Sequence, residues 1–293
     1  EELVDINYQN IENGHVDITQ TLHKLASYYF EQGKVNLAIE TSRRGVENVI
    51  KGYGTNHKYY AFALSHLASI QSDDEGILNI KTALEVLSTI DDNDSRFSLR
   101  FELAKRYSSK GQVEKAIYEY HRLLSEAKDN DLLSAEIYEQ LELCYLRQSD
   151  WGKAFLCTEK TILINKKLGK SESQYVEIYL KSAERFEKSG FLSGEFRQFQ
   201  KALEIKEALN QFDDSITAEI HNSLGLNLLE RGDYHRAIVL FVSAIKIWEK
   251  HKGIASEEVA STKGNYSKCL MALDKHEEAL FSALECRDKF IEL

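Results

Sequence analysis

Apolar residues recur at three- and four-residue spacing along most of this chain, which is the period of an amphipathic helix. The stretch LGLNLLERGDYHRAIVLFVSAI, which begins at Leu224, shows two such stripes. Leu224 and Leu228 belong to the first stripe, Phe241 and Ala244 belong to the second, and Gly232 lies between them. Two apolar stripes separated by a glycine predict two helices joined by a tight turn.

The same succession of small and large residues recurs along the chain. An alanine of the second helix stands at the corresponding place in five copies, namely Ala38, Ala116, Ala154, Ala237 and Ala279. Glu195 occupies that place in another copy, and residues 61–90 are interpreted as a further copy with a shortened turn. Successive copies lie about 40 residues apart, a period typical of stacked supersecondary units. The pattern predicts an all-α fold, a right-handed α-solenoid of about seven helix hairpins over residues 18–293. Residues 1–17 are then an N-terminal flank, for which the end of a preceding helix is one interpretation.

The sizes of the residues give this order a physical reason. Small residues such as Gly225 and Ala237 let the two helices of a hairpin approach closely, and aromatic residues and leucines fill the space between hairpins. Asp233 is expected to cap the second helix of its hairpin. Glycine is expected to end the first helix in a left-handed conformation, which costs little only for glycine. The glycines in that position are Gly33, Gly111, Gly190 and Gly232. The aromatic residues expected to fill the core are Tyr29, Tyr107, Tyr120, Tyr145, Phe186, Phe199 and Phe241.

These columns resemble the tetratricopeptide repeat family, in which each unit is a helix hairpin. The units here are longer than usual, and in this they resemble the repeats of kinesin light chains and of the peptide-sensing Rap-type regulators of bacteria. In kinesin-light-chain-like repeats an Asn pair ahead of the leucine column holds peptide backbone. Asn222 keeps the first of those places and Ser223 replaces the second, whereas Gly264 and Asn265 show the reverse in the last unit.

The resemblance implies that the first helices line the concave face of a superhelix and bind a protein or peptide there. On this basis an apolar strip is expected in the C-terminal half, made by Leu143, Leu146, Leu180, Leu226, Leu229 and Met271. Asn222 is expected to bond the backbone of an extended peptide, and Arg147 and Lys268 to contact its acidic groups. Two alternatives for the strip stay open at this point: a ligand occupies it, or a neighbouring domain or the superhelix itself covers it.

Composition narrows the function further. The 293 residues include no proline, which is unusual against an average of about 5% and agrees with a nearly all-helical chain. The net charge of −10 argues against binding to nucleic acid or to an anionic membrane surface. No apolar run is long enough for a membrane span. The cysteines, which are Cys144, Cys157, Cys269 and Cys286, lack metal-site spacing and are expected to be buried thiols in a cytoplasmic protein.

No set of residues with catalytic or metal-binding spacing is found. Gly169-Lys170-Ser171 lacks the earlier glycine of a phosphate-binding loop, because Ile164 stands at that place. The sequence therefore predicts no cofactor, no metal and no enzymatic activity. It favours a scaffold that binds a peptide or a helical segment of a partner protein on its concave face. The alternative is a Rap-like, peptide-sensing regulatory module of a larger signalling protein. The sequence leaves the oligomeric state open.

Overall fold

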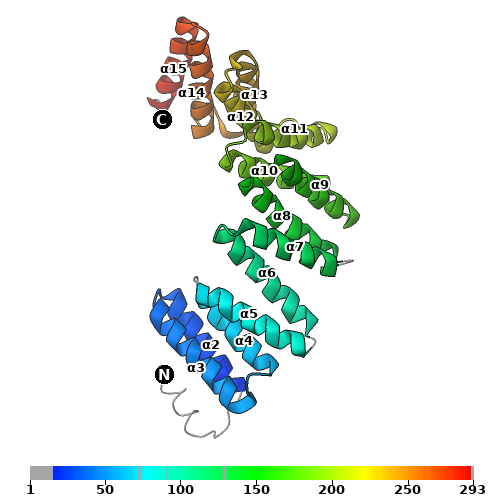
Figure 1. The fold of residues 1–293 in the computed structure, drawn as a ribbon. Helices are drawn as coiled ribbons and strands as arrows, with labels where there is room; N and C mark the ends of the chain where they lie inside the picture. Colours follow the sequence, from blue (N-terminus) through cyan, green and yellow to red (C-terminus); the bar gives the residue numbers. More distant parts are fainter. Residues whose placement is uncertain (1–15, 72–73, 91, 128–129, 292–293) are drawn as a thin grey trace. The chain divides into compact units, whose positions relative to one another are not determined.

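The computed structural model describes residues 16–71, 74–90, 92–127 and 130–291, and within these ranges every regular element is a helix (Figure 1). Fourteen helices follow one another in these ranges and pair into seven antiparallel hairpins. The predicted all-α solenoid of about seven hairpins is confirmed. Residues 1–15 lie outside the described residues, and α2 begins at Val16, so the interpretation of the N-terminal flank stays a prediction.

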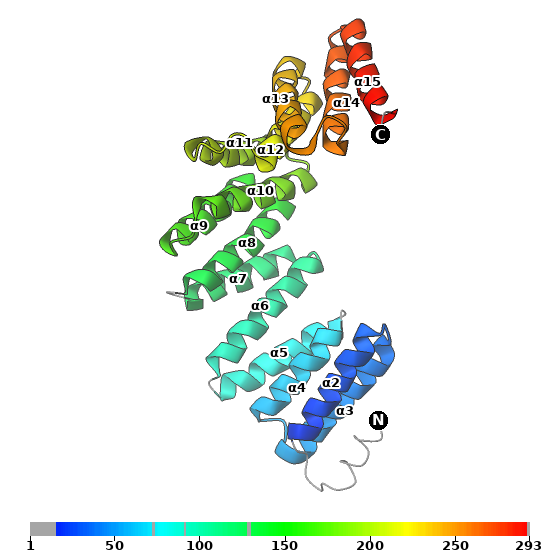
Figure 2. The same ribbon diagram turned by 180° about the vertical axis from the view of Figure 1, so that it is seen from behind.

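The chain divides into two compact units at residue 130. The first unit holds three hairpins, and the second holds four. The first contains α2 (Val16–Glu31) with α3 (Val35–Tyr53), α4 (Lys58–Ile70) with α5 (Asp74–Thr89), and α6 (Asn93–Ser109) with α7 (Val113–Ala127). The second contains α8 (Asp131–Arg147) with α9 (Trp151–Lys167), α10 (Glu172–Lys188) with α11 (Leu192–Ala208), α12 (Ser215–Glu230) with α13 (Tyr234–Lys252), and α14 (Glu257–Ala272) with α15 (His276–Ile291). Within each unit the hairpins follow in chain order, and Figure 2 shows the same pairings from behind. That residues 18–293 form one superhelical domain stays a prediction.

The turns inside the hairpins have the predicted left-handed residue. Gly33, Gly111, Gly190 and Gly232 all have φ between 73° and 78°. In two hairpins a polar residue takes this place, Ser149 with φ 57° and Asp274 with φ 59°. The predicted cap is confirmed as well, because the side chain of Asp233 accepts a hydrogen bond from the backbone N–H of Arg236. Local residue choice therefore sets where each hairpin turns.

Close helix approach occurs at the small residues. Ala38, Ala116, Ala154 and Ala237 are fully buried, and a Cβ added at Gly225 would lie 2.7 Å from the ring of Phe241. Glu195 does not interrupt the packing, because the preceding Gly194 makes the close approach in its hairpin. A Cβ at Gly194 would overlap the ring of Phe186.

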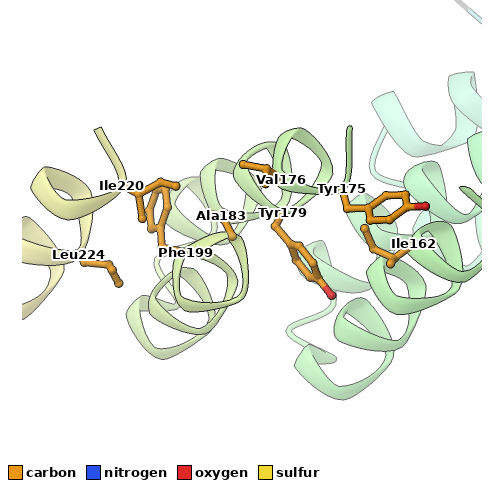
Figure 3. Close-up of a cluster of buried hydrophobic side chains, with 9 residues drawn as sticks. Ile162, Tyr175, Val176, Tyr179, Ala183, Phe199, Ile220 and Leu224 are labelled. Carbon is orange, nitrogen blue, oxygen red and sulfur yellow. The ribbon is translucent and has the colours of Figure 1, made fainter. Parts of the chain in front are cut away.

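The core runs from hairpin to hairpin instead of closing around one centre. One buried cluster joins Ile162 of α9, Val176 and Tyr179 of α10, Phe199 of α11 and Ile220 of α12 (Figure 3). Such a core is expected of a repeat array, in which each unit is stabilised by its neighbours. Six of the seven aromatic residues predicted to fill the core are buried, and Tyr29 is half-buried.

Three cysteines, Cys144, Cys157 and Cys269, are free thiols buried in this packing. The side chain of Cys286 lies outside the described residues. In the part of the chain that the structure describes, no helix has both the length and the apolar composition needed to cross a membrane.

Candidate functional site

All the residues predicted to bind a partner lie on first helices of the second unit. Leu143, Leu146 and Arg147 are on α8, Leu180 is on α10, Asn222, Leu226 and Leu229 are on α12, and Lys268 and Met271 are on α14. We call the surface formed by α8, α10, α12 and α14 the first-helix face. The structure divides the predicted residues on this face into two groups, one at each end of the unit.

The first group gathers around a groove between α8 and α10. Leu143, Leu146 and Arg147 line a cavity of about 670 Å³ together with residues of the neighbouring hairpin. The other lining residues are Ser149, Lys181, Glu184, Arg185, Lys188 and Ser189. We call this cavity the α8–α10 groove. It combines an apolar floor from α8 with several cationic side chains, and such a combination suits a ligand that has both apolar and acidic groups.

Five of the basic and hydroxyl residues of the groove were not predicted as site residues. The sequence does carry a signal for three of them, since Lys181, Arg185 and Lys188 are spaced by four and three and so share one helical face. Periodic spacing places them on one side of α10, but it does not show that this side meets α8. The packing of the two hairpins decides that.

Arg185 is held in the groove wall by two carboxylates, of which Glu142 is buried and Glu139 half-exposed. Its guanidinium donates to Glu142 at 2.5 Å and to Glu139 at 3.2 Å. Glu142 is 2% exposed and also accepts from the hydroxyls of Thr158 and Ser182. Burial lowers the pKa of Arg185, but the charges of Glu142 and Glu139 outweigh it and hold the pKa above its ordinary value. Arg185 is thus a permanent, positioned cation.

The leucines of the predicted strip are less open than expected. Leu146 is buried, Leu180 packs on the cluster of α9 to α12, and Leu226 and Leu229 pack half-buried on the cluster of Leu228, Ala237, Phe241 and Cys269. Packing on neighbouring helices thus covers these leucines in part, and only Leu146 is buried. The strip as a binding surface stays a prediction, and both alternatives for it stay open. Met271 remains exposed, and Leu143 is half-exposed at the α8–α10 groove.

The second group of predicted residues lies on α12 and α14, and three polar atoms of these two helices have no partner among the described residues. The Oδ1 of Asn222, the Nδ1 of His221 and the Oγ of Ser267 are buried and have no hydrogen-bond partner among the described residues. Burial lowers the pKa of His221, although the charge of Glu207 opposes this, so the imidazole is neutral near neutral pH. Buried polar atoms are almost always hydrogen-bonded, so these three atoms are candidates for bonds to a ligand or to water.

The helix that carries Ser267 also has a glycine one turn earlier that packs against no other side chain. Gly264 lies inside α14, and a Cβ added there would meet nothing within 4 Å. Lys268, one turn further on, is exposed and donates to the side chain of Asn265 at 3.1 Å. A glycine in a helix interior is destabilising by about 1 kcal/mol relative to alanine, and internal packing gives no reason for it here.

Neither group of residues on the first-helix face forms a candidate metal-binding site. Among the described residues, no group of three or more His, Cys, Asp or Glu side chains is arranged to hold a metal ion.

Comparison with known proteins agrees with this fold. Residues 217–254, which cover most of α12, all of α13 and the turn between them, match the family model described as tetratricopeptide repeat. No curated protein sequence matches the chain.

Solved structures give the same class of fold. The C-terminal part of a TPR repeat-containing protein from Cytophaga hutchinsonii is 14% identical, with a TM-score of 0.55 over 92% of this chain and 99% of that one. The apo form of RapI is 17% identical, with a TM-score of 0.52 over 94% of this chain and 77% of that one. Aspartyl phosphate phosphatase F from Bacillus subtilis is 15% identical, with a TM-score of 0.50 over 83% of this chain and 62% of that one. The fold is therefore an α-solenoid of TPR-like helix hairpins, and the predicted resemblance to tetratricopeptide repeat proteins is confirmed.

Proposed function

We propose that this protein is a non-enzymatic scaffold that binds a peptide or a helical segment of a partner protein on the first-helix face of residues 131–293. The α8–α10 groove carries the proposal. It is a concave site with an apolar floor and cationic walls, on the face that the first helices form. Grooves of this kind suit a segment that anchors an apolar side chain and pairs acidic groups with the surrounding cations.

The polar atoms at the other end of the face support the same mode of binding. The unpaired Oδ1 of Asn222 is an acceptor suited to a backbone N–H of an extended chain. Gly264 leaves room for that chain to approach α14 closely. Arg147 in the groove and Lys268 on α14 keep the role predicted for them, contact with acidic groups of the ligand.

The test is selection of peptides on the full chain from a displayed library, followed by measurement of their affinity. Two variants probe the two ends of the face without disturbing the core, Lys188→Glu in the groove and Asn222→Ala on α12. Lys188 is exposed, so reversal of its charge leaves the packing intact. We expect Lys188→Glu to weaken binding of acidic peptides about tenfold, which corresponds to about 1.4 kcal/mol. Asn222→Ala should weaken binding by a smaller factor, since it removes one hydrogen bond.

The matched control is Lys160→Glu. Lys160 is an exposed lysine on the second helix α9, so the substitution makes the same charge change away from the first-helix face. It should leave the affinity within experimental error of the native chain. Peptides that bind both test variants as tightly as the control would show that the ligand sits elsewhere.

A second candidate is a peptide-sensing regulatory module of a larger signalling protein. The fold likeness to RapI, which spans 94% of this chain, favours it over other uses of the repeat. A sensing module must change conformation when its ligand binds. Small-angle scattering of the chain with and without a selected peptide separates the two candidates. A changed scattering profile supports the sensing module, and an unchanged one supports the scaffold.

A further inference from the structure

A separate groove lies in the first unit, between the first helices α4 and α6. It is a cavity of about 490 Å³, and one residue of the intervening helix α5 also lines it. The apolar lining residues are Phe62, Ala68, Ile80 and Leu99. The polar lining residues are Ser65, Ser69, Asp94, Ser95, Ser98 and Glu102. We call this cavity the α4–α6 groove.

The serine hydroxyls of the α4–α6 groove mainly offer acceptors to a ligand. Ser69 and Ser98 each donate to a backbone carbonyl three or four residues earlier, at 2.7 Å and 3.2 Å. Ser95 donates to the carboxylate of Asp92 at 3.0 Å. A hydroxyl has one proton and two lone pairs, so these three groups have used their proton and keep acceptor capacity. Only Ser65 among the lining residues has a side-chain proton that no described acceptor takes.

Two carboxylates complete the polar lining. Asp94 is exposed in the first turn of α6, and its carboxylate forms no ion pair among the described residues. The Oε1 of Glu102 accepts from Arg106 at 2.9 Å, and the same guanidinium donates to the backbone oxygen of Ala68 at 2.6 Å. The Oε2 of Glu102 has no partner in the part of the chain that the structure describes. No basic or amide side chain is among the described residues that line the groove, so its polar surface calls for a ligand that brings donors.

The apolar part of the groove fits the stem of a long basic side chain. Phe62 on α4 is 38% exposed, and Leu99 on α6 is buried. Lysine and arginine pack their methylene groups on apolar surface while the charged end reaches polar groups. An exposed aromatic ring adds a favourable contact with the cation. The α8–α10 groove has the opposite chemistry, because four basic side chains line it.

We propose that the α4–α6 groove binds a basic segment of a partner protein, with an arginine or lysine side chain paired to Asp94 and Glu102. Charge complementarity selects this occupant. An acidic or neutral segment would take the acceptors of the groove out of water without giving them donors, which is unfavourable. The inference goes beyond the proposed function, which concerns residues 131–293 and a ligand with acidic groups.

The test is selection of peptides on the full chain from a displayed library, with removal of every peptide that the Asp94→Asn variant binds equally well. The remaining peptides should be rich in arginine and lysine. They should bind the native chain about tenfold more tightly than the variant, and their affinity should fall as the salt concentration rises. Replacement of the inserted arginine by citrulline, which keeps the shape but not the charge, should lower the affinity by a similar factor.

Asp17→Asn is the matched control for the charge change. Asp17 is an exposed aspartate at the second position of α2, as Asp94 is at the second position of α6. Its backbone oxygen accepts from the hydroxyl of Thr21, as that of Asp94 accepts from Ser98. Asp17→Asn should therefore leave the affinity of the selected peptides unchanged.

Ser98→Leu tests the groove by bulk instead of charge. Ser98 lines the groove and is exposed, so a leucine there fills part of the groove without entering the core. The substitution should weaken binding at least tenfold. Ser125→Leu is its control, because Ser125 is exposed on α7 and does not line the groove. Thermal melts of both variants show whether the fold is kept.

Three outcomes would overturn the proposal. The first is a selection that leaves no peptides after the removal step, and the second is a set of peptides without basic residues. The third is binding to Ser98→Leu as tight as binding to Ser125→Leu. Lys188→Glu separates this proposal from the proposed function, because it alters the α8–α10 groove alone. It should leave the affinity of the basic peptides within experimental error of the native chain.

Discussion

Asn227 on α12 donates its side-chain amide to the carboxylate of Glu195 on α11 at 2.8 Å, and this bond joins two consecutive hairpins. Glu195 is buried at the place where five other copies of the repeat have alanine. Burial raises the pKa of Glu195 above 4.5, the bond from Asn227 opposes this, and the charges of Glu187 and Glu230 raise it further. The folded state therefore holds the proton more tightly than the unfolded state does.

Glu195→Gln is expected to stabilise the protein at neutral pH. A carboxyl with a raised pKa costs stability as pH increases from the ordinary value through the raised one, and glutamine keeps an acceptor for Asn227 without that cost. Urea unfolding at pH 7 should show the gain, and unfolding below pH 4 should show little difference between the variants. Glu219→Gln, at an exposed position of α12, should show no gain at pH 7. Equal stability of Glu195→Gln and the native chain at pH 7 would contradict the assignment.

Ala237→Leu should reduce the free energy of unfolding by about 1–3 kcal/mol, because the added atoms have no space in a close-packed core. Ala237 is fully buried in the cluster with Leu228 and Phe241. Val239→Leu is the control, since Val239 lies two residues further on and is exposed. Thermal melts in which the two variants unfold at the same temperature would show that the alanine column is not the site of close helix approach.

Arg185→Met should cost about 3–5 kcal/mol, because it leaves the carboxylate of Glu142 buried without its cation. Adding Glu142→Gln removes the stranded charge, so the double variant should be more stable than Arg185→Met alone. The comparison is made by denaturant unfolding, with Lys181→Met as the control. Lys181 pairs with Glu177 on the surface, where an ion pair contributes about 0–1 kcal/mol. A loss no larger than that of the control would show that Glu142 does not need the pair.

Acid should destabilise the first unit through two stacked histidines. The rings of His23 on α2 and His66 on α4 lie 4.0 Å apart, and His66 bonds the hydroxyls of Ser27 and Ser42. Burial, and then the nearby His66, lower the pKa of His23 from 6.5 to about 3. Burial also lowers the pKa of His66, although its contact with His23 opposes this.

The sign follows from proton uptake. Below about pH 6.5 the unfolded chain binds protons that the folded His23 does not, so stability falls as pH decreases from 6.5 toward 3. One proton contributes at most about 1.4 kcal/mol per pH unit. His23→Phe should flatten this dependence, whereas the exposed His235→Phe should leave it as in the native chain. The measurement is urea unfolding at several pH values, and equal slopes for the two variants would contradict the prediction.

The sequence by itself determined the hairpins. Helix periodicity, turn glycines and buried alanines are local features, because each depends on residues within one or two turns of the same hairpin. Their recurrence about every 40 residues was enough to predict the number of units, the class of fold and the tight approaches at Gly225 and Ala237. Ser149 and Asp274 have the same left-handed conformation although neither is glycine. These two turns therefore follow from the spacing of the repeat and not from the residue type alone.

The tertiary structure decided which residues of the first-helix face stay open. Leu146 stands at the same repeat position as the exposed Met271, and Leu226 at the same repeat position as the exposed Lys268. Packing nevertheless buries Leu146 and half-buries Leu226. Arg185 and Glu142 are 43 residues apart, and no local pattern connects them. Hairpin geometry follows from short-range periodicity, whereas the junction between hairpins depends on which side chains meet across a separation of about 40 residues. The candidate binding surface belongs to those junctions, so only the folded chain defines it.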